Sequence, residues 1–100
     1  MNPGIPGVAY TVVFWSEVIV EGDIRHVPKS KLRAAIEQVE QTPEVGKHLT
    51  GDLQGYRSTR IGGSVGRIIY RILEGEQRVE VVAMGQRKDD AVCDTAAGRV

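Results

Sequence analysis

The hydrophobic positions of the chain change their spacing near its middle. Residues 10–15 (YTVVFW) form a short apolar run rich in β-branched and aromatic residues, which predicts a strand with both faces covered. Residues 29–41 instead carry apolar side chains at spacings of three and four, which predicts an amphipathic helix. Its apolar stripe consists of Leu32, Ala35, Ile36 and Val39. Pro28 precedes this helix, and Thr42-Pro43 ends it.

From residue 53 onward the pattern is that of strands joined by short turns. Residues 56–61, 67–73 (RIIYRIL) and 78–84 (RVEVVAM) predict three strands in succession. The glycine-rich segment 62–66 and residues 74–77 predict the two turns between them. We therefore expect an antiparallel meander in this half of the chain.

Two further segments predict short helices. Residues 17–26 predict one, although Gly22 and three consecutive β-branched residues disfavour it. Residues 89–99 predict one helical turn or two. The predicted fold is therefore α+β in the order β-α-α-β-β-β, with an antiparallel sheet packed on two helices and a short C-terminal helix.

Length and composition indicate one domain. We expect residues 1–100 to form a single unit with a modest core, and the Pro/Gly-rich residues 1–8 to be flexible. A hydrophobic share of 41% and a charged share of 26% argue against general disorder. The single cysteine cannot form an internal disulfide, and no leader or long apolar run is visible. We expect a cytoplasmic protein that does not associate with membranes.

The formal net charge is zero, but the charges are unevenly distributed. Residues 47–88 carry eight basic and four acidic side chains, whereas residues 1–46 and 89–100 each have a net charge of −2. A neutral total argues against a protein that coats nucleic acid without specificity. The arginine-rich central segment nevertheless leaves local binding of a polyanion open.

Metal and cofactor motifs are not evident. His26 and His48 lack metal-ligand spacing with any cysteine or carboxylate pair, so we expect no metal site. The glycines of residues 62–66 are not followed by the Lys-Ser/Thr pair and helix of a phosphate-binding loop. A hairpin turn explains these glycines, and we expect no cofactor.

Six short motifs, in order and at fitting spacings, resemble the RelE/ParE superfamily of toxins from bacterial type II toxin–antitoxin pairs. They are residues 27–29 (VPK), 47–51 (KHLTG), 56–62 (YRSTRIG), 67–72 (RIIYRI), 81–87 (VVAMGQR) and 96–99 (AAGR). Each motif is weak alone, and their shared order makes the resemblance specific. It implies the α+β fold described above.

The resemblance also implies a function and a partner. In RNA-cleaving members of the family, a basic sheet surface meets messenger RNA on the ribosome, and a ribose 2′-hydroxyl attacks the adjacent phosphate. Cations stabilise the charge that accumulates on the phosphate, and the planar arginine fork suits two phosphate oxygens. The resemblance thus implies an endoribonuclease (mRNA interferase) that is silenced by a cognate antitoxin in a hetero-oligomer.

Candidate site residues follow from the motifs. The resemblance implies catalytic roles for Arg57, Arg67 and Arg87, and RNA-binding roles for Arg60, Arg71 and Lys88. A second strand cation of such enzymes would fall at Thr59 or at Arg60, depending on a one-residue slip in the hairpin. Only Arg60 would supply the charge.

One departure from the family pattern leaves the activity open. Cys93 stands where some members carry a tyrosine that stacks on a base or assists the 2′-hydroxyl, and a thiol cannot stack. Three functions therefore remain: an RNA-cleaving toxin, a toxin that binds a protein target such as gyrase without cleaving RNA, and an inactive interaction module.

Overall fold

The fold is seen in a computed structural model, which describes residues 9–20, 25, 27–62, 66–86 and 91–100. The strands are β1 (Thr11–Phe14), β2 (Lys47–His48), β3 (Arg57–Ile61), β4 (Gly66–Leu73) and β5 (Arg78–Gln86). The helices are α1 (Ser16–Val20), α2 (Lys29–Gln41) and α3 (Ala91–Arg99), with short 3₁₀ turns η2 (Pro43–Val45), η3 (Gly51–Leu53) and η4 (Glu74–Glu76). The predicted α+β class and the short C-terminal helix are confirmed.

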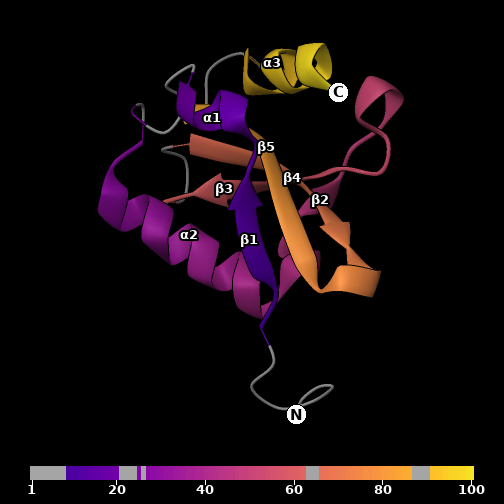
Figure 1. The fold of residues 1–100 in the computed structure, drawn as a ribbon. Coiled ribbons are helices and arrows are strands. Elements are labelled where there is room, and N and C mark those ends of the chain that lie inside the picture. Colours follow the sequence, from indigo (N-terminus) through magenta and orange to yellow (C-terminus); the bar gives the residue numbers. More distant parts are fainter. Residues whose placement is uncertain (1–8, 21–24, 26, 63–65, 87–90) are drawn as a thin grey trace.

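The five strands form one sheet in the order β1-β5-β4-β3-β2 (Figure 1). The predicted meander is present as β3, β4 and β5, which pair antiparallel. β1 joins the outer edge of β5 in parallel, and β2 adds two residues to the edge of β3. The sequence did not predict β2, because two residues are too few to show an alternation of polar and apolar positions.

Helix α2 covers one face of the sheet. It begins and ends at the predicted residues, and Leu32, Ala35 and Val39 of its apolar stripe are buried. These side chains share a core cluster with Ile68 and Tyr70 of β4. The amphipathic pattern therefore identified correctly the helix face that packs on the sheet.

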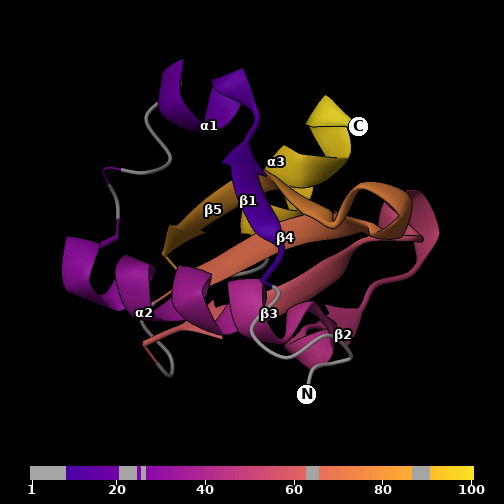
Figure 2. The same cartoon turned by 60° about the horizontal axis from the view of Figure 1, so that its bottom comes forward.

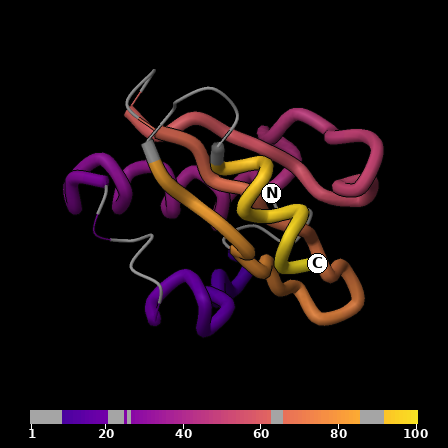
Figure 3. The backbone as a smooth tube through the Cα atoms, turned by 90° about the horizontal axis from the view of Figure 1, so that it is seen from above, coloured from indigo at the N-terminus to yellow at the C-terminus, as the bar shows by residue number. Residues whose placement is uncertain are grey.

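Helix α3 covers the opposite face (Figures 2 and 3). Val92 and Ala96 are buried there in a second cluster with Ile69 and Ala83. Neighbouring positions of β4 thus pack on different helices, which explains why its apolar run is almost continuous rather than alternating. The sequence predicted a C-terminal helix but carried no sign of the face on which it would lie.

A β-bulge in β5 determines which buried side chains of this strand lie on each face of the sheet. Ile69 pairs with Ala83 and Tyr70 with Val81, so Val82 is an extra residue without a partner across the pair. A bulge of this kind shifts the alternation of the side chains along the strand. Val81 therefore lies in the α2 cluster, whereas Val82 and Ala83 both lie in the α3 cluster.

Two other predictions concern the first part of the chain. α1 corresponds to the start of the helix predicted over residues 17–26, and its Val18 is fully buried. Residues 21–24 and 26, together with the predicted flexible residues 1–8, lie outside the described residues. No helix in the described part of the chain is long and apolar enough to cross a membrane.

The buried hydroxyl of Tyr70 connects the sheet to the segment that leads into β2. It donates a hydrogen bond to the carbonyl of Pro43 (2.6 Å) and accepts one from the backbone N–H of Gly46 (2.9 Å). Burial raises the pKa of Tyr70, so its hydroxyl stays protonated and keeps its donor at physiological pH. The close approach leaves no room for a side chain at Gly46, since an added Cβ would overlap the Tyr70 hydroxyl.

A Gly46→Ala substitution should therefore destabilise the fold. We expect a loss of about 1–3 kcal/mol in the free energy of unfolding, the usual cost of overpacking a filled site, measured by urea denaturation. Gly75→Ala is the matched control, because an added Cβ there meets no atom within 4 Å. Equal stability of the two variants would show that the Gly46–Tyr70 contact is not tight.

Candidate nucleic-acid interface

The pairing of β3 with β4 places two arginines side by side. Arg60 is opposite Arg67, and Arg67 is in turn opposite Gly85 of β5. Directly paired residues of antiparallel strands share a face of the sheet, with Cβ atoms about 4.5–5.5 Å apart. Arg60 is exposed and Arg67 half-buried. The side chains of Arg60 and Arg67 thus leave the sheet next to each other on one face.

This surface is on the α3 side of the sheet. Thr59 is opposite Ile68, which is buried in the α2 cluster, so Thr59 and Arg60 face opposite ways. The register therefore answers the question that the hairpin left open in the sequence. It is Arg60, not Thr59, that accompanies Arg67.

Cys93 of α3 reaches the same pair. A guanidinium nitrogen of Arg67 lies 3.6 Å from the Cys93 Sγ, within hydrogen-bonding range for sulfur. The helix approaches β5 closely because Gly85 has no side chain, and a Cβ there would lie 3.3 Å from Val92. The position that resembles the family tyrosine is therefore next to Arg67 in space, and here it presents a half-buried thiol.

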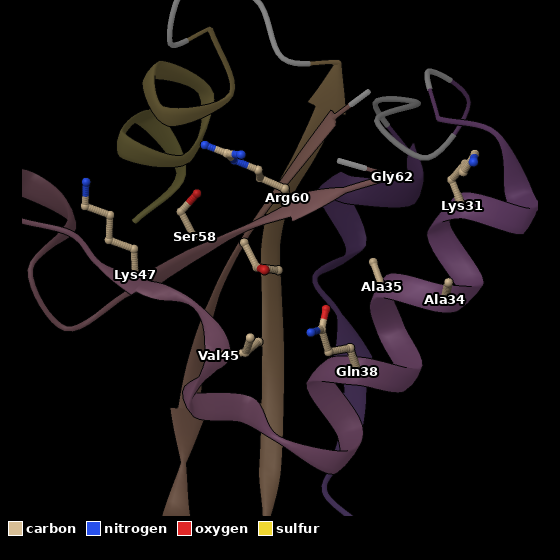
Figure 4. Close-up of a pocket in the computed structure, with 10 residues that line it drawn as sticks. Lys31, Ala34, Ala35, Gln38, Val45, Lys47, Ser58, Arg60 and Gly62 are labelled. Carbon is tan, nitrogen blue, oxygen red and sulfur yellow. The ribbon is translucent and has the colours of Figure 1, made fainter. Parts of the chain in front are cut away.

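A lysine that the sequence analysis did not select extends this surface. Lys47 of β2 is opposite Ser58, and it is exposed. Figure 4 shows the side chains of Lys47, Ser58 and Arg60 pointing to the same side of the sheet, away from α2. We call Lys47, Arg60 and Arg67 the cationic face. The sequence contained Lys47, but a two-residue strand gave no period from which its direction could be predicted.

Arg57 does not join the cationic face. It is opposite Tyr70, whose side chain is buried on the α2 side. Its guanidinium donates hydrogen bonds to the backbone carbonyls of Glu44 (3.1 Å) and Gly46 (2.9 Å). The structure therefore separates Arg57 from Arg67, although both were expected near one phosphate, and it gives Arg57 contacts within the fold.

Arg71 lies on the α3 side but is engaged by a carboxylate. Its guanidinium donates two hydrogen bonds to Glu80 (2.9 and 2.7 Å) and stacks over the Tyr56 ring with 5.9 Å to the centroid. Glu80 also accepts a hydrogen bond from the indole of Trp15 (3.2 Å). The hydrogen bonds from Arg71 hold the pKa of Glu80 below its usual value. The Arg71 charge is thus largely neutralised within the protein.

The remaining predicted site residues, Arg87 and Lys88, lie outside the described residues. Within the described residues, no three His, Cys, Asp or Glu side chains are grouped so that they could hold a metal ion. The described chemistry of this face is therefore that of fixed cations.

A groove of about 620 Å³ runs along the other side of β3 (Figure 4). Helix α2 forms one wall with Ala35 and Gln38, and Val45 and Thr59 line the opposite wall. Lys47 and Arg60 also border it, although their side chains point away from α2. Strand β3 therefore separates the groove from the cationic face.

A family model described as "ParE toxin of type II toxin-antitoxin system, parDE" matches residues 22–91. A chain in the toxin–antitoxin complex RelBE2 from Mycobacterium tuberculosis is 30% identical, with a TM-score of 0.66. The match covers 83% of this chain and 97% of that one. The chain belongs to the RelE/ParE superfamily of type II toxins. Its role as the toxin of a type II toxin–antitoxin system follows from this membership.

Two further solved structures resemble the toxin. A variant of E. coli RelE in the free state has a TM-score of 0.69 at 20% identity, with 92% of this chain and 98% of that chain covered, and shows the shared fold alone. The YoeB/ParE toxin from Agrobacterium tumefaciens is 28% identical, with a TM-score of 0.56 and coverage of 78% and 99%. No curated protein sequence matches the toxin.

The Arg71–Glu80 pair should make the stability of the toxin depend on pH. Because the folded-state pKa of Glu80 is lowered, its contribution is present above the unfolded value of about 4.3. That contribution is lost as the pH falls through the folded value. We expect a decline of no more than about 1 kcal/mol, since 39% of the Arg71 side chain is exposed to solvent.

Urea denaturation between pH 7 and pH 3 would measure this effect, with Glu80→Gln as the reference. The difference in unfolding free energy between wild type and Glu80→Gln should shrink toward low pH. A difference that stays constant over this range would show that the ion pair does not stabilise the fold.

Proposed function

We propose that the toxin arrests growth by cleaving messenger RNA at the ribosome, in the cytoplasm, through its cationic face. The observation that supports this proposal is the cross-strand pair of Arg60 and Arg67 on the α3 side of the sheet. Two adjacent guanidinium groups form a binding site for a phosphodiester, because each fork can contact two phosphate oxygens.

The proposed reaction is an attack of a ribose 2′-oxygen on the adjacent phosphorus. The new bond joins this oxygen to phosphorus, and the bond from phosphorus to the 5′-oxygen of the next nucleotide breaks. The products are a cyclic phosphate and a 5′-hydroxyl, with the 2′ proton passing to solvent or a side chain and a proton reaching the leaving oxygen. Arg60 and Arg67 would stabilise the extra negative charge on the phosphate oxygens in the transition state.

We further propose that a cognate antitoxin silences the toxin in a hetero-oligomer. Similar chains occur in the toxin–antitoxin complexes from Mycobacterium tuberculosis and E. coli. An acidic antitoxin segment placed over Arg60 and Arg67 would neutralise them and exclude RNA at the same time. A short acidic reading frame beside the toxin gene would support this part of the proposal.

A second candidate function is binding of a protein target such as gyrase without RNA cleavage. Two observations favour it. The matching family model is that of the ParE toxins, and Cys93 supplies a thiol beside Arg67 at the position that resembles a tyrosine of some family members. In this case the same arginines would contact acidic groups of a protein rather than phosphates.

Mapping of messenger 5′ ends after induction of the toxin alone distinguishes these functions. We expect cuts at defined codon positions, and Arg60→Ala combined with Arg67→Ala should reduce them at least about 100-fold, the usual effect of losing transition-state donors. Arg33→Ala is the matched control, because Arg33 is exposed on α2, on the other face of the sheet. It should leave cleavage unchanged.

Other outcomes would contradict the nuclease proposal. Growth arrest with intact transcripts would point to the gyrase-type function, which a supercoiling assay would then test. Unchanged growth would indicate an inactive interaction module. Full cleavage by the double variant would show that Arg60 and Arg67 are not the site.

A further inference from the structure

We propose that Lys47 is an additional phosphate-contacting residue of the toxin, and that Arg57 and Tyr70, on the opposite face of the sheet, are positioning residues that hold it there. This inference rests on the proposed action on RNA and extends the site by one strand. Lys47 lies on the cationic face and is exposed to solvent. Among the described residues, no contact of its side chain explains this position.

Lys47 lies near the arginine pair on the same face of the sheet. Lys47 is opposite Ser58, two residues before Arg60 on the same strand. A diagonal neighbour across two strands lies about 7–8 Å away, a distance that long side chains can span. Lys47, Arg60 and Arg67 therefore form a continuous row of cations across β2, β3 and β4, which suits a chain of phosphates better than a single anion.

Strand β2 is held by few contacts of its own. It consists of two residues, and it pairs with Ser58 and Arg57 alone. Both of its side chains are exposed, so packing against the core does not fix its position. The direction of Lys47 must therefore depend on the contacts of the segment that precedes it.

That segment is held by two residues of neighbouring strands. Tyr70 bonds to Pro43 and Gly46 through its hydroxyl, and Arg57 bonds to the carbonyls of Glu44 and Gly46. Two of these four hydrogen bonds engage Gly46, one at its N–H and one at its carbonyl. We call this arrangement the Arg57–Tyr70 clamp.

The Arg57–Tyr70 clamp affects the opposite face of the sheet through Gly46. Gly46 has extended backbone angles (φ −72°, ψ 149°) and leads directly into Lys47. Because successive residues of an extended chain point to opposite sides, holding Gly46 against the α2 side directs Lys47 to the α3 side. Arg57 thereby acts on the cationic face without belonging to it. This indirect role explains why Arg57 stands in a motif that resembles the RNA-binding part of the family.

The test uses the purified full-length toxin and a fluorescent single-stranded RNA whose 2′ positions are methylated, so that it cannot be cleaved. The dissociation constant is measured by anisotropy over a range of KCl concentrations. Loss of one phosphate contact lowers the slope of log affinity against log salt by about 0.7 for a single strand. Lys47→Ala should show this decrease, and Lys29→Ala, which removes an exposed lysine of α2 on the other face, should not.

The clamp is tested by a double-mutant cycle. Tyr70→Phe should lower the salt slope about as much as Lys47→Ala, and it should have no further effect in the Lys47→Ala background. A merely structural role of Tyr70 would lower affinity equally in both backgrounds. Arg57→Lys provides a second variant if Tyr70→Phe fails to fold, because lysine keeps the charge but lacks the guanidinium fork. It should give the same non-additive decrease.

The possible failures are distinguishable. An unchanged slope in Lys47→Ala, with binding lost in the Arg60→Ala/Arg67→Ala variant, would overturn this inference and leave the proposed function intact. Additive effects of Lys47→Ala and Arg57→Lys would overturn the clamp. Wild-type toxin that does not bind the RNA at any salt concentration would overturn the inference, and the mapping of messenger 5′ ends decides separately on the proposed function.

Discussion

The main-chain pairing of β3 with β4 determines which side chains of the toxin can act together. Strand side chains alternate between the two faces, so a slip of one residue would exchange the faces of every residue in β3. In the observed register, Arg60 joins Arg67 on the α3 side, and Arg57 joins Tyr70 on the α2 side. The composition of the cationic face is therefore a consequence of backbone hydrogen bonds rather than of local charge density.

The polar side chains on the two faces of the sheet have different roles. On the α2 side, Arg57 and Tyr70 satisfy backbone groups of the segment before β2, and the two hydrogen bonds of the Tyr70 hydroxyl are buried from solvent. On the α3 side, Arg60 and Lys47 remain exposed. An exposed cation keeps its hydration until a ligand arrives, which makes it suited to reversible binding of a polyanion.

Neutralisation within the fold further selects among the cations. Arg71 and Arg67 are on the same strand and the same side, yet Arg71 is bound to Glu80, which Trp15 also holds. The residue opposite Arg67 in β5 is Gly85. Because an ion pair cancels most of the field of its arginine, Arg71 adds little to the basic character of this surface.

The class of the fold and the bounds of its main elements could be predicted from the sequence. The spacing of Leu32, Ala35 and Val39 identified α2 and its buried face, because a helical stripe is a local property of the chain. The apolar run of β4 and the turns around it likewise located the meander. The six motifs between residues 27 and 99, taken in order, indicated the family to which the chain belongs.

The composition of the candidate site, in contrast, depends on contacts between strands. Whether Thr59 or Arg60 accompanies Arg67 depends on pairing across a hairpin, which a single strand does not encode. The roles of Arg57 and Lys47 depend on contacts between segments far apart in the sequence, such as that of Tyr70 with Pro43. Local patterns record which side chains are available, whereas long-range pairing determines which of them meet.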